Sequence, residues 1–128
     1  MKNFKAQGAI ASMITITVVV TALGLSIASI ATIVKTTGFF HQKSEQAFYL
    51  AESGIEDGLI KLARDPNYTG ESALPISSGN VTIMVRTEGS DLIVTSKGVV
   101  ENITRKIEAK VNIDSLGKVS FVSWKEIK

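Results

Sequence analysis

Side chains that could do chemistry are few and scattered in this chain. Its one histidine, His41, directly follows Phe39 and Phe40, and the chain has no cysteine. A protein metal site needs several histidines, cysteines or carboxylates at ligand spacing. We therefore interpret His41 as a residue at a membrane–water interface, and we expect neither a metal nor a cofactor.

Carboxylates gather at one place, where Glu52, Glu56 and Asp57 fall on one side of a predicted helix. Paired catalytic carboxylates work inside a cleft, which a helix surface does not provide. The sequence has no phosphate-binding glycine loop and no nucleophile–base set. We interpret the three acids as a solvated face or a subunit contact, and we expect no enzymatic activity.

The element that dominates the sequence is an apolar stretch near the N-terminus. Residues 9–34 contain no charged side chain; Lys2 and Lys5 precede them and Lys35 follows. A helix of this length covers about 39 Å, whereas the hydrocarbon core of a bilayer is about 30 Å thick. The apolar region of a cleaved secretory signal is shorter, about 7–15 residues. The pattern predicts a transmembrane helix over residues 9–35.

This helix contains hydroxyl and small side chains. Ser and Thr hydroxyls can bond back to the helix backbone, so they are compatible with insertion into lipid. Small side chains at Ala22, Gly24 and Ala28 allow another helix to approach closely. Two interpretations stay open: a plain single-pass anchor, or a helix that packs against other helices.

The positive charges predict the orientation of the chain. Short loops rich in lysine remain in the cytoplasm, and the N-terminal arm carries Lys2, Lys5 and no acid. We expect the N-terminus inside the cytoplasmic membrane and the rest of the chain outside. The net charge is +2 with no block of like charge, so the sequence gives no sign of nucleic-acid binding.

An amphipathic helix is predicted over residues 36–65. Apolar residues recur there at spacings of three and four: Phe48, Ala51, Ile55, Leu59 and Leu62. Gly54 and Gly58 lie beside this stripe and would let another backbone come close. Gly38 is a point where the helix could break, and Pro66 should end it.

A loop and then a small sheet complete the prediction. Residues 66–80 contain two prolines and two glycines and read as a loop. Residues 81–128 contain three strand signals, over 81–87, 92–98 and 103–113, and residues 119–124 are either a fourth strand or a tail. The short connections favour an antiparallel meander.

The sheet needs a cover, and the stripe from Phe48 to Leu62 is the apolar partner outside the membrane. In particular, we expect Ile55, Leu59 and Leu62 to face Ile107, Ala109 and Val111. The predicted fold is α+β: a long N-terminal helix, half transmembrane and half amphipathic, packed on a sheet of three or four antiparallel strands.

Three segments give the sequence a family resemblance. They are Lys5-Ala-Gln-Gly8-Ala9-Ile10, Thr21-Ala-Leu-Gly-Leu-Ser26 and Gln46-Ala-Phe-Tyr-Leu-Ala-Glu-Ser-Gly-Ile-Glu-Asp-Gly-Leu59. With its basic leader over residues 1–8, the sequence resembles type IV pilins and type II secretion pseudopilins, most of all minor pilins of the PilX kind. The resemblance covers residues 1 to about 65 well, and the sheet in outline.

The resemblance implies that a prepilin peptidase cuts between Gly8 and Ala9. It also implies a filament subunit whose partners are other pilin subunits, bound through the N-terminal helix, the assembly machinery and, before assembly, the lipid bilayer. Met13 stands where the family usually has a glutamate, so the segment is either an uncut anchor or part of a subunit that lacks the neighbour this acid would pair with. The alternative function is a single-pass, membrane-anchored extracytoplasmic binding or envelope protein that does not polymerise.

Overall fold

The structure is a computed structural model that describes residues 2–128, with side chains from Ala6 onward. It contains one helix, α1 (Lys2–Arg64), and five strands. The chain divides into two compact units, Met1–Phe40 and His41–Lys128. The helix assignment continues through Gly38, so this glycine does not end the helix, and the helix ends one residue before Asp65.

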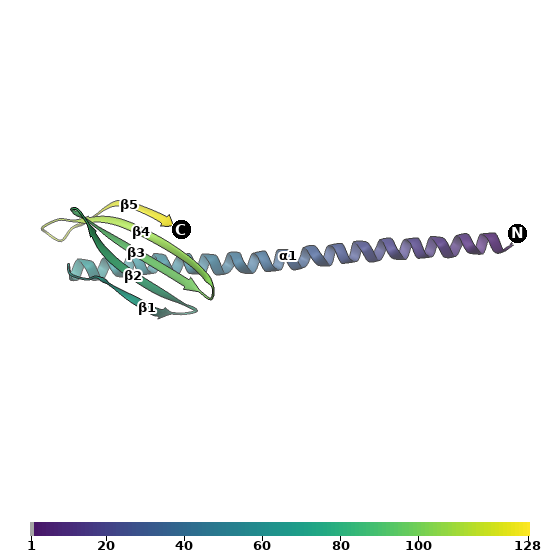
Figure 1. Cartoon of the computed structure of the whole chain (residues 1–128), viewed down its shortest axis with the longest axis horizontal. Coiled ribbons are helices and arrows are strands. Elements are labelled where there is room, and N and C mark those ends of the chain that lie inside the picture. The colour runs from purple at the N-terminus through teal and green to yellow at the C-terminus, as the bar shows by residue number, and fades with distance from the viewer. Residues whose placement is uncertain (1) are drawn as a thin grey trace. The chain divides into compact units, whose positions relative to one another are not determined.

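The five strands form one antiparallel sheet in chain order (Figure 1). They are β1 (Gly70–Ile76), β2 (Gly79–Glu88), β3 (Asp91–Val100), β4 (Ile103–Ile113) and β5 (Val119–Ile127). The strands from β1 to β4 follow one another through tight turns, as the predicted meander requires. Gly89 in the turn after β2 and Glu101 in the turn after β3 both have positive φ, 64° and 55°.

The sheet has more strands than the three or four we expected, because the loop predicted over residues 66–80 is wrong. This segment holds β1 and the start of β2. Pro75 suggested a loop, but β1 is an edge strand that pairs only with β2, where a missing N–H need not break a ladder. The pairing is irregular between Glu71 and Leu74, and Ala73 has a φ of 54°.

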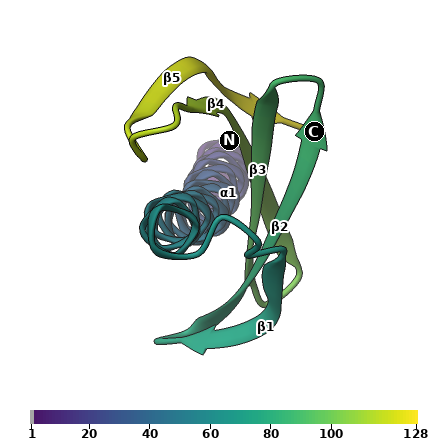
Figure 2. The same ribbon diagram turned by 90° about the vertical axis from the view of Figure 1, so that its left-hand side faces the viewer.

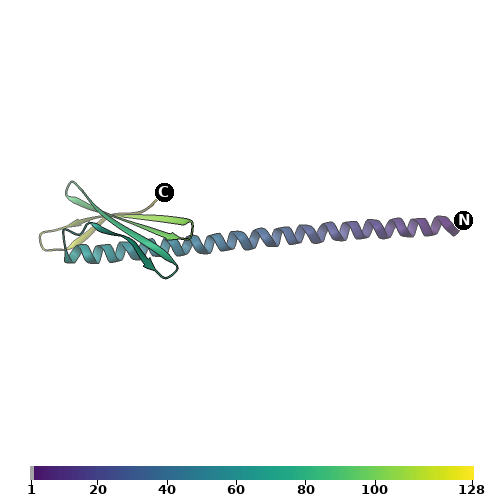
Figure 3. The same ribbon diagram turned by 60° about the horizontal axis from the view of Figure 1, so that its bottom comes forward.

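Within the second unit the sheet curves around the last turns of α1, with β1 and β5 on opposite sides of the helix (Figure 2). Figure 3 shows the strands lying along this part of the helix. Alternate residues of the central strands face the helix and are buried, while their neighbours face the other way. The core between helix and sheet consists of Ala51, Ile55, Leu62, Val81, Ile83, Val94, Ile107, Ala109 and Val111. The α+β fold predicted from the sequence is therefore confirmed.

Candidate functional site

The helix of the first unit exposes its apolar side chains. The large apolar residues from Ile10 to Val34 have exposed fractions between 51% and 70%. This helix is long and apolar enough to span a membrane. Gly8 and Ala9, the expected cleavage point, both lie in the helix and are exposed.

Hydroxyl groups on this helix bond to its own backbone. Each donates a hydrogen bond of 2.7–3.0 Å to the carbonyl four residues earlier: Ser12, Thr15, Thr17, Thr21, Ser26, Ser29 and Thr32. The donors are satisfied within the helix, so the segment can enter hydrocarbon without losing them. Because these protons are already in use, contacts with another helix depend more on shape than on hydroxyl donors.

The three small residues predicted to pack do not share one face of the helix. At about 100° per residue, Gly24 and Ala28 lie on one face, and Ala22 lies roughly 160° away from Gly24. A Cβ added to Gly24 would meet no atom within 4 Å, so this surface is open. Ala22 instead borders a shallow groove of about 330 Å³ beside Thr17 and Thr21.

The helix residues predicted to pack on the sheet all lie at the helix–sheet interface of the second unit. Ala51, Ile55 and Leu62 are buried, with exposed fractions of 0–1%, and Phe48 and Leu59 pack against the same core while partly exposed. Gly54 and Gly58 also face the sheet. A Cβ on Gly54 would lie 2.5 Å from Val81 Cγ1, and one on Gly58 would lie 3.0 Å from Ile83 Cγ2.

Three further residues of this interface were missed. Ala47 has no exposed surface, and Gly98 of β3 lies directly under it. Ser96, two residues earlier on β3, is buried against Gly54, and its Oγ has no hydrogen-bond partner in the described part of the chain. The sequence did contain a signal, since a glycine inside a strand marks a close backbone approach.

Arg105 of β4 ties the helix to the sheet and was also missed. Its guanidinium bonds Glu126 of β5 through two nitrogens and donates to Ser44 Oγ on α1 at 2.5 Å. It also lies 5.5 Å from the centre of the Phe48 ring. Hydrogen bonding to Glu126 raises the pKa of Arg105, and hydrogen bonding to Arg105 lowers the pKa of Glu126, so both groups stay charged at neutral pH.

The acidic helix residues do not form a reactive cluster. Asp57 pairs with Lys61 at 2.9 Å, and Lys61 also pairs with Glu71 of β1 at 2.8 Å. Glu56 is exposed and Glu52 is partly exposed. His41 lies 3.3 Å from Glu45, and the described residues contain no group of three or more possible metal ligands.

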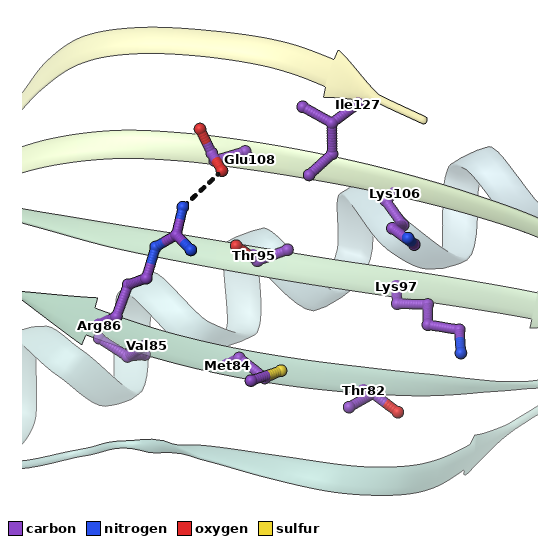
Figure 4. Close-up of a pocket in the computed structure, with 9 residues that line it drawn as sticks. All are labelled: Thr82, Met84, Val85, Arg86, Thr95, Lys97, Lys106, Glu108 and Ile127. Carbon is purple, nitrogen blue, oxygen red and sulfur yellow. Dashed lines mark hydrogen bonds and ion pairs between the residues drawn. The ribbon is translucent and has the colours of Figure 1, made fainter.

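A groove of about 400 Å³ lies on the sheet face that points away from the helix (Figure 4). Its lining comes from the three central strands and the end of β5: Thr82, Met84, Val85, Arg86, Thr95, Lys97, Lys106, Glu108 and Ile127. At one end, Glu108 accepts a hydrogen bond from Arg86 at 3.2 Å and pairs with Lys125 at the same distance. At the other end lie Lys97 and Lys106.

Comparison of the chain with models of protein families, with curated proteins and with solved structures finds no match in any of the three.

Proposed function

We propose that this chain is a structural subunit of a type IV pilus-like or type II secretion-like filament, a minor pilin or pseudopilin assembled through its N-terminal helix. The observation that carries the proposal is that one helix has two segments with different surfaces. The segment up to Phe40 exposes apolar side chains all round, whereas the segment from His41 buries one stripe against a sheet. An anchor alone needs no small-residue face, and Gly24 and Ala28 provide one.

Assembly would move the apolar helix from lipid into a bundle of other subunits' helices. Lipid tails are already apolar, so this transfer gains little hydrophobic energy, and close packing must supply the preference. The face with Gly24 and Ala28 suits this role because small residues four positions apart let two helix backbones approach. The hydroxyl protons are already used within the helix, so contacts between helices depend more on the shape of their surfaces than on hydroxyl donors.

The first test concerns the N-terminus. We expect a prepilin peptidase to cut between Gly8 and Ala9, leaving the basic leader in the cytoplasm and Ala9 as the new terminus. Mass analysis of the N-terminal peptide from native cells should find a chain that begins at Ala9. Gly8→Val should block the cut, and Ala6→Val should permit it. Surface filaments that contain the chain with Met1 intact would contradict the proposal.

The second test concerns the helix surface. Gly24→Leu should leave membrane insertion unchanged, because leucine is at least as apolar as glycine. It should lower incorporation into surface filaments several-fold, because the larger side chain holds a neighbouring helix away. The measurement is the amount of protein in sheared filaments divided by the amount in membranes.

Ile30→Leu is the matched control, since it adds no volume to an exposed position of the same helix. An unchanged ratio for Gly24→Leu, with wild type clearly present in filaments, would reject this packing face. Wild type that stays entirely in membranes would favour a membrane-anchored binding or envelope protein that does not polymerise.

A further inference from the structure

Two lysines oppose each other on the outer face of the sheet. Lys97 of β3 and Lys106 of β4 are direct partners in the antiparallel register. Like charges at directly opposed positions destabilise a sheet. No carboxylate in the described part of the chain forms an ion pair with either ammonium group. The fold therefore retains an arrangement that costs stability.

The other cations of this face are compensated. Arg86 and Lys125 share Glu108, and Lys110 lies 3.4 Å from Glu88 and 3.5 Å from Asp91. Hydrogen bonding to Glu88 raises the pKa of Lys110. Uncompensated positive charge is thus confined to the end of the groove that holds the opposed lysines.

The groove combines this charge with hydroxyl and apolar groups. Thr82 of β2 is the register partner of Lys97, and Ile127 of β5 is the partner of Lys106, so one row crosses four strands. Met84, Thr95 and Glu108 form the next row, and Arg86 and Lys125 pair with the Glu108 carboxylate (Figure 4). Two ammonium groups therefore lie beside two hydroxyls and two apolar side chains on an open surface.

We propose that this groove binds an acidic polysaccharide, with a sugar carboxylate between the ammonium groups of Lys97 and Lys106. Thr82 and Thr95 can exchange hydrogen bonds with sugar hydroxyls, and Met84 and Ile127 can cover the C–H face of the ring. The ligand needs only one carboxylate per bound sugar. Tight nucleic-acid binding uses several phosphate contacts, whereas this row offers two ammonium groups.

Sugar binding in this groove does not require filament assembly. Within the second unit the groove faces away from α1 (Figure 4), and none of its lining residues belongs to this helix. A subunit that failed to assemble would still bind the sugar, and a subunit that assembled need not bind it. The two proposals can therefore fail separately.

The test uses the full chain in detergent micelles and a trimer of galacturonic acid as the probe, titrated calorimetrically. Lys97→Gln and Lys106→Gln should each weaken binding about tenfold, because each removes a charge-assisted hydrogen bond. Lys118→Gln is the matched control, since it removes the same charge from an exposed position outside the groove. Binding should also weaken as salt is raised.

A melting curve separates loss of the site from loss of the fold. Because the opposed lysines repel each other, Lys106→Gln should melt at the wild-type temperature or above it while binding is lost. No binding of the trimer at millimolar concentration would overturn the proposal, as would equal binding of a neutral galactose trimer or an equal effect of Lys118→Gln. Tighter binding of polyglutamate, single-stranded DNA or inorganic phosphate would assign the groove to another kind of anion.

Discussion

Gly98→Ala is expected to disrupt the packing of helix on sheet more than the same substitution at Gly54 or Gly58 of α1. A Cβ at this position would overlap Ala47 O and would lie 2.7 Å from Ala51 N. Both are backbone atoms of α1, so neither can turn aside as a flexible side chain could. The helix would have to move off the sheet and open the core, at a cost of about 3 kcal/mol or more. This loss can be measured by thermal melting of the full chain in detergent, monitored by the circular dichroism signal of the β-sheet.

Two glycines on the helix side provide graded comparisons. A Cβ on Gly54 would meet side-chain atoms of Ser96 and Val81, which can shift slightly. A Cβ on Gly58 would have its nearest contact at 3.0 Å, and alanine also favours the helix by about 1 kcal/mol. We therefore expect the melting temperature to fall most for Gly98→Ala, less for Gly54→Ala and least for Gly58→Ala. A wild-type melting temperature for Gly98→Ala would mean that helix and strand are further apart.

The helix–sheet interface could be predicted in part because periodicity identifies the face that an element buries. The spacing of Ala51, Ile55 and Leu62 gave the helix stripe, and the alternation through Ile107 and Ala109 gave the sheet face. Periodicity does not report the distance between backbones. Gly98 was therefore predicted only as the last residue of a strand, although Gly98 lies directly beneath α1.

Strand β1 was not predicted because some of its residues favour a loop and others favour a strand. Pro75 and the surrounding glycines and serines favour a loop, and only Leu74 and Ile76 keep the alternation of a strand. Pairing with β2, a contact made after the turn at residues 77–78, decides the outcome. A tertiary contact of this kind overrides local propensity, as is common for edge strands.

The outer groove could not be predicted, because its residues come together only in the observed register of the strands, and the sequence analysis did not assign a register. Lys97 and Lys106 come together only because the turn after Val100 sets Val100 opposite Ile103. A shift of one residue would send alternate side chains to the other face and bring different residues together. The sequence prediction placed β2, β3 and β4 to within a few residues, which is enough for the fold class but not for a pair of side chains.

Ile55→Ala is expected to destabilise the second unit by about 2–5 kcal/mol, the range for removing a large aliphatic side chain from a closed core. Ile55 has no exposed surface and is among the largest fully buried side chains. Its loss leaves a cavity between α1 and the central strands. Denaturant unfolding of the full chain in micelles would show a lower midpoint with an unchanged slope.

The same measurement on Leu59→Ala and Ile60→Ala tests how α1 is rotated about its own axis relative to the sheet. Leu59 is partly buried, so Leu59→Ala should cost less than Ile55→Ala. Ile60 has 53% of its surface exposed, and Ile60→Ala should change stability by no more than about 0.5 kcal/mol. Because neighbouring residues lie about 100° apart on a helix, the order of the three costs reports which face meets the sheet. A larger loss at Ile60 than at Ile55 would show that the opposite face of α1 packs on the sheet, and the core described above would then be wrong.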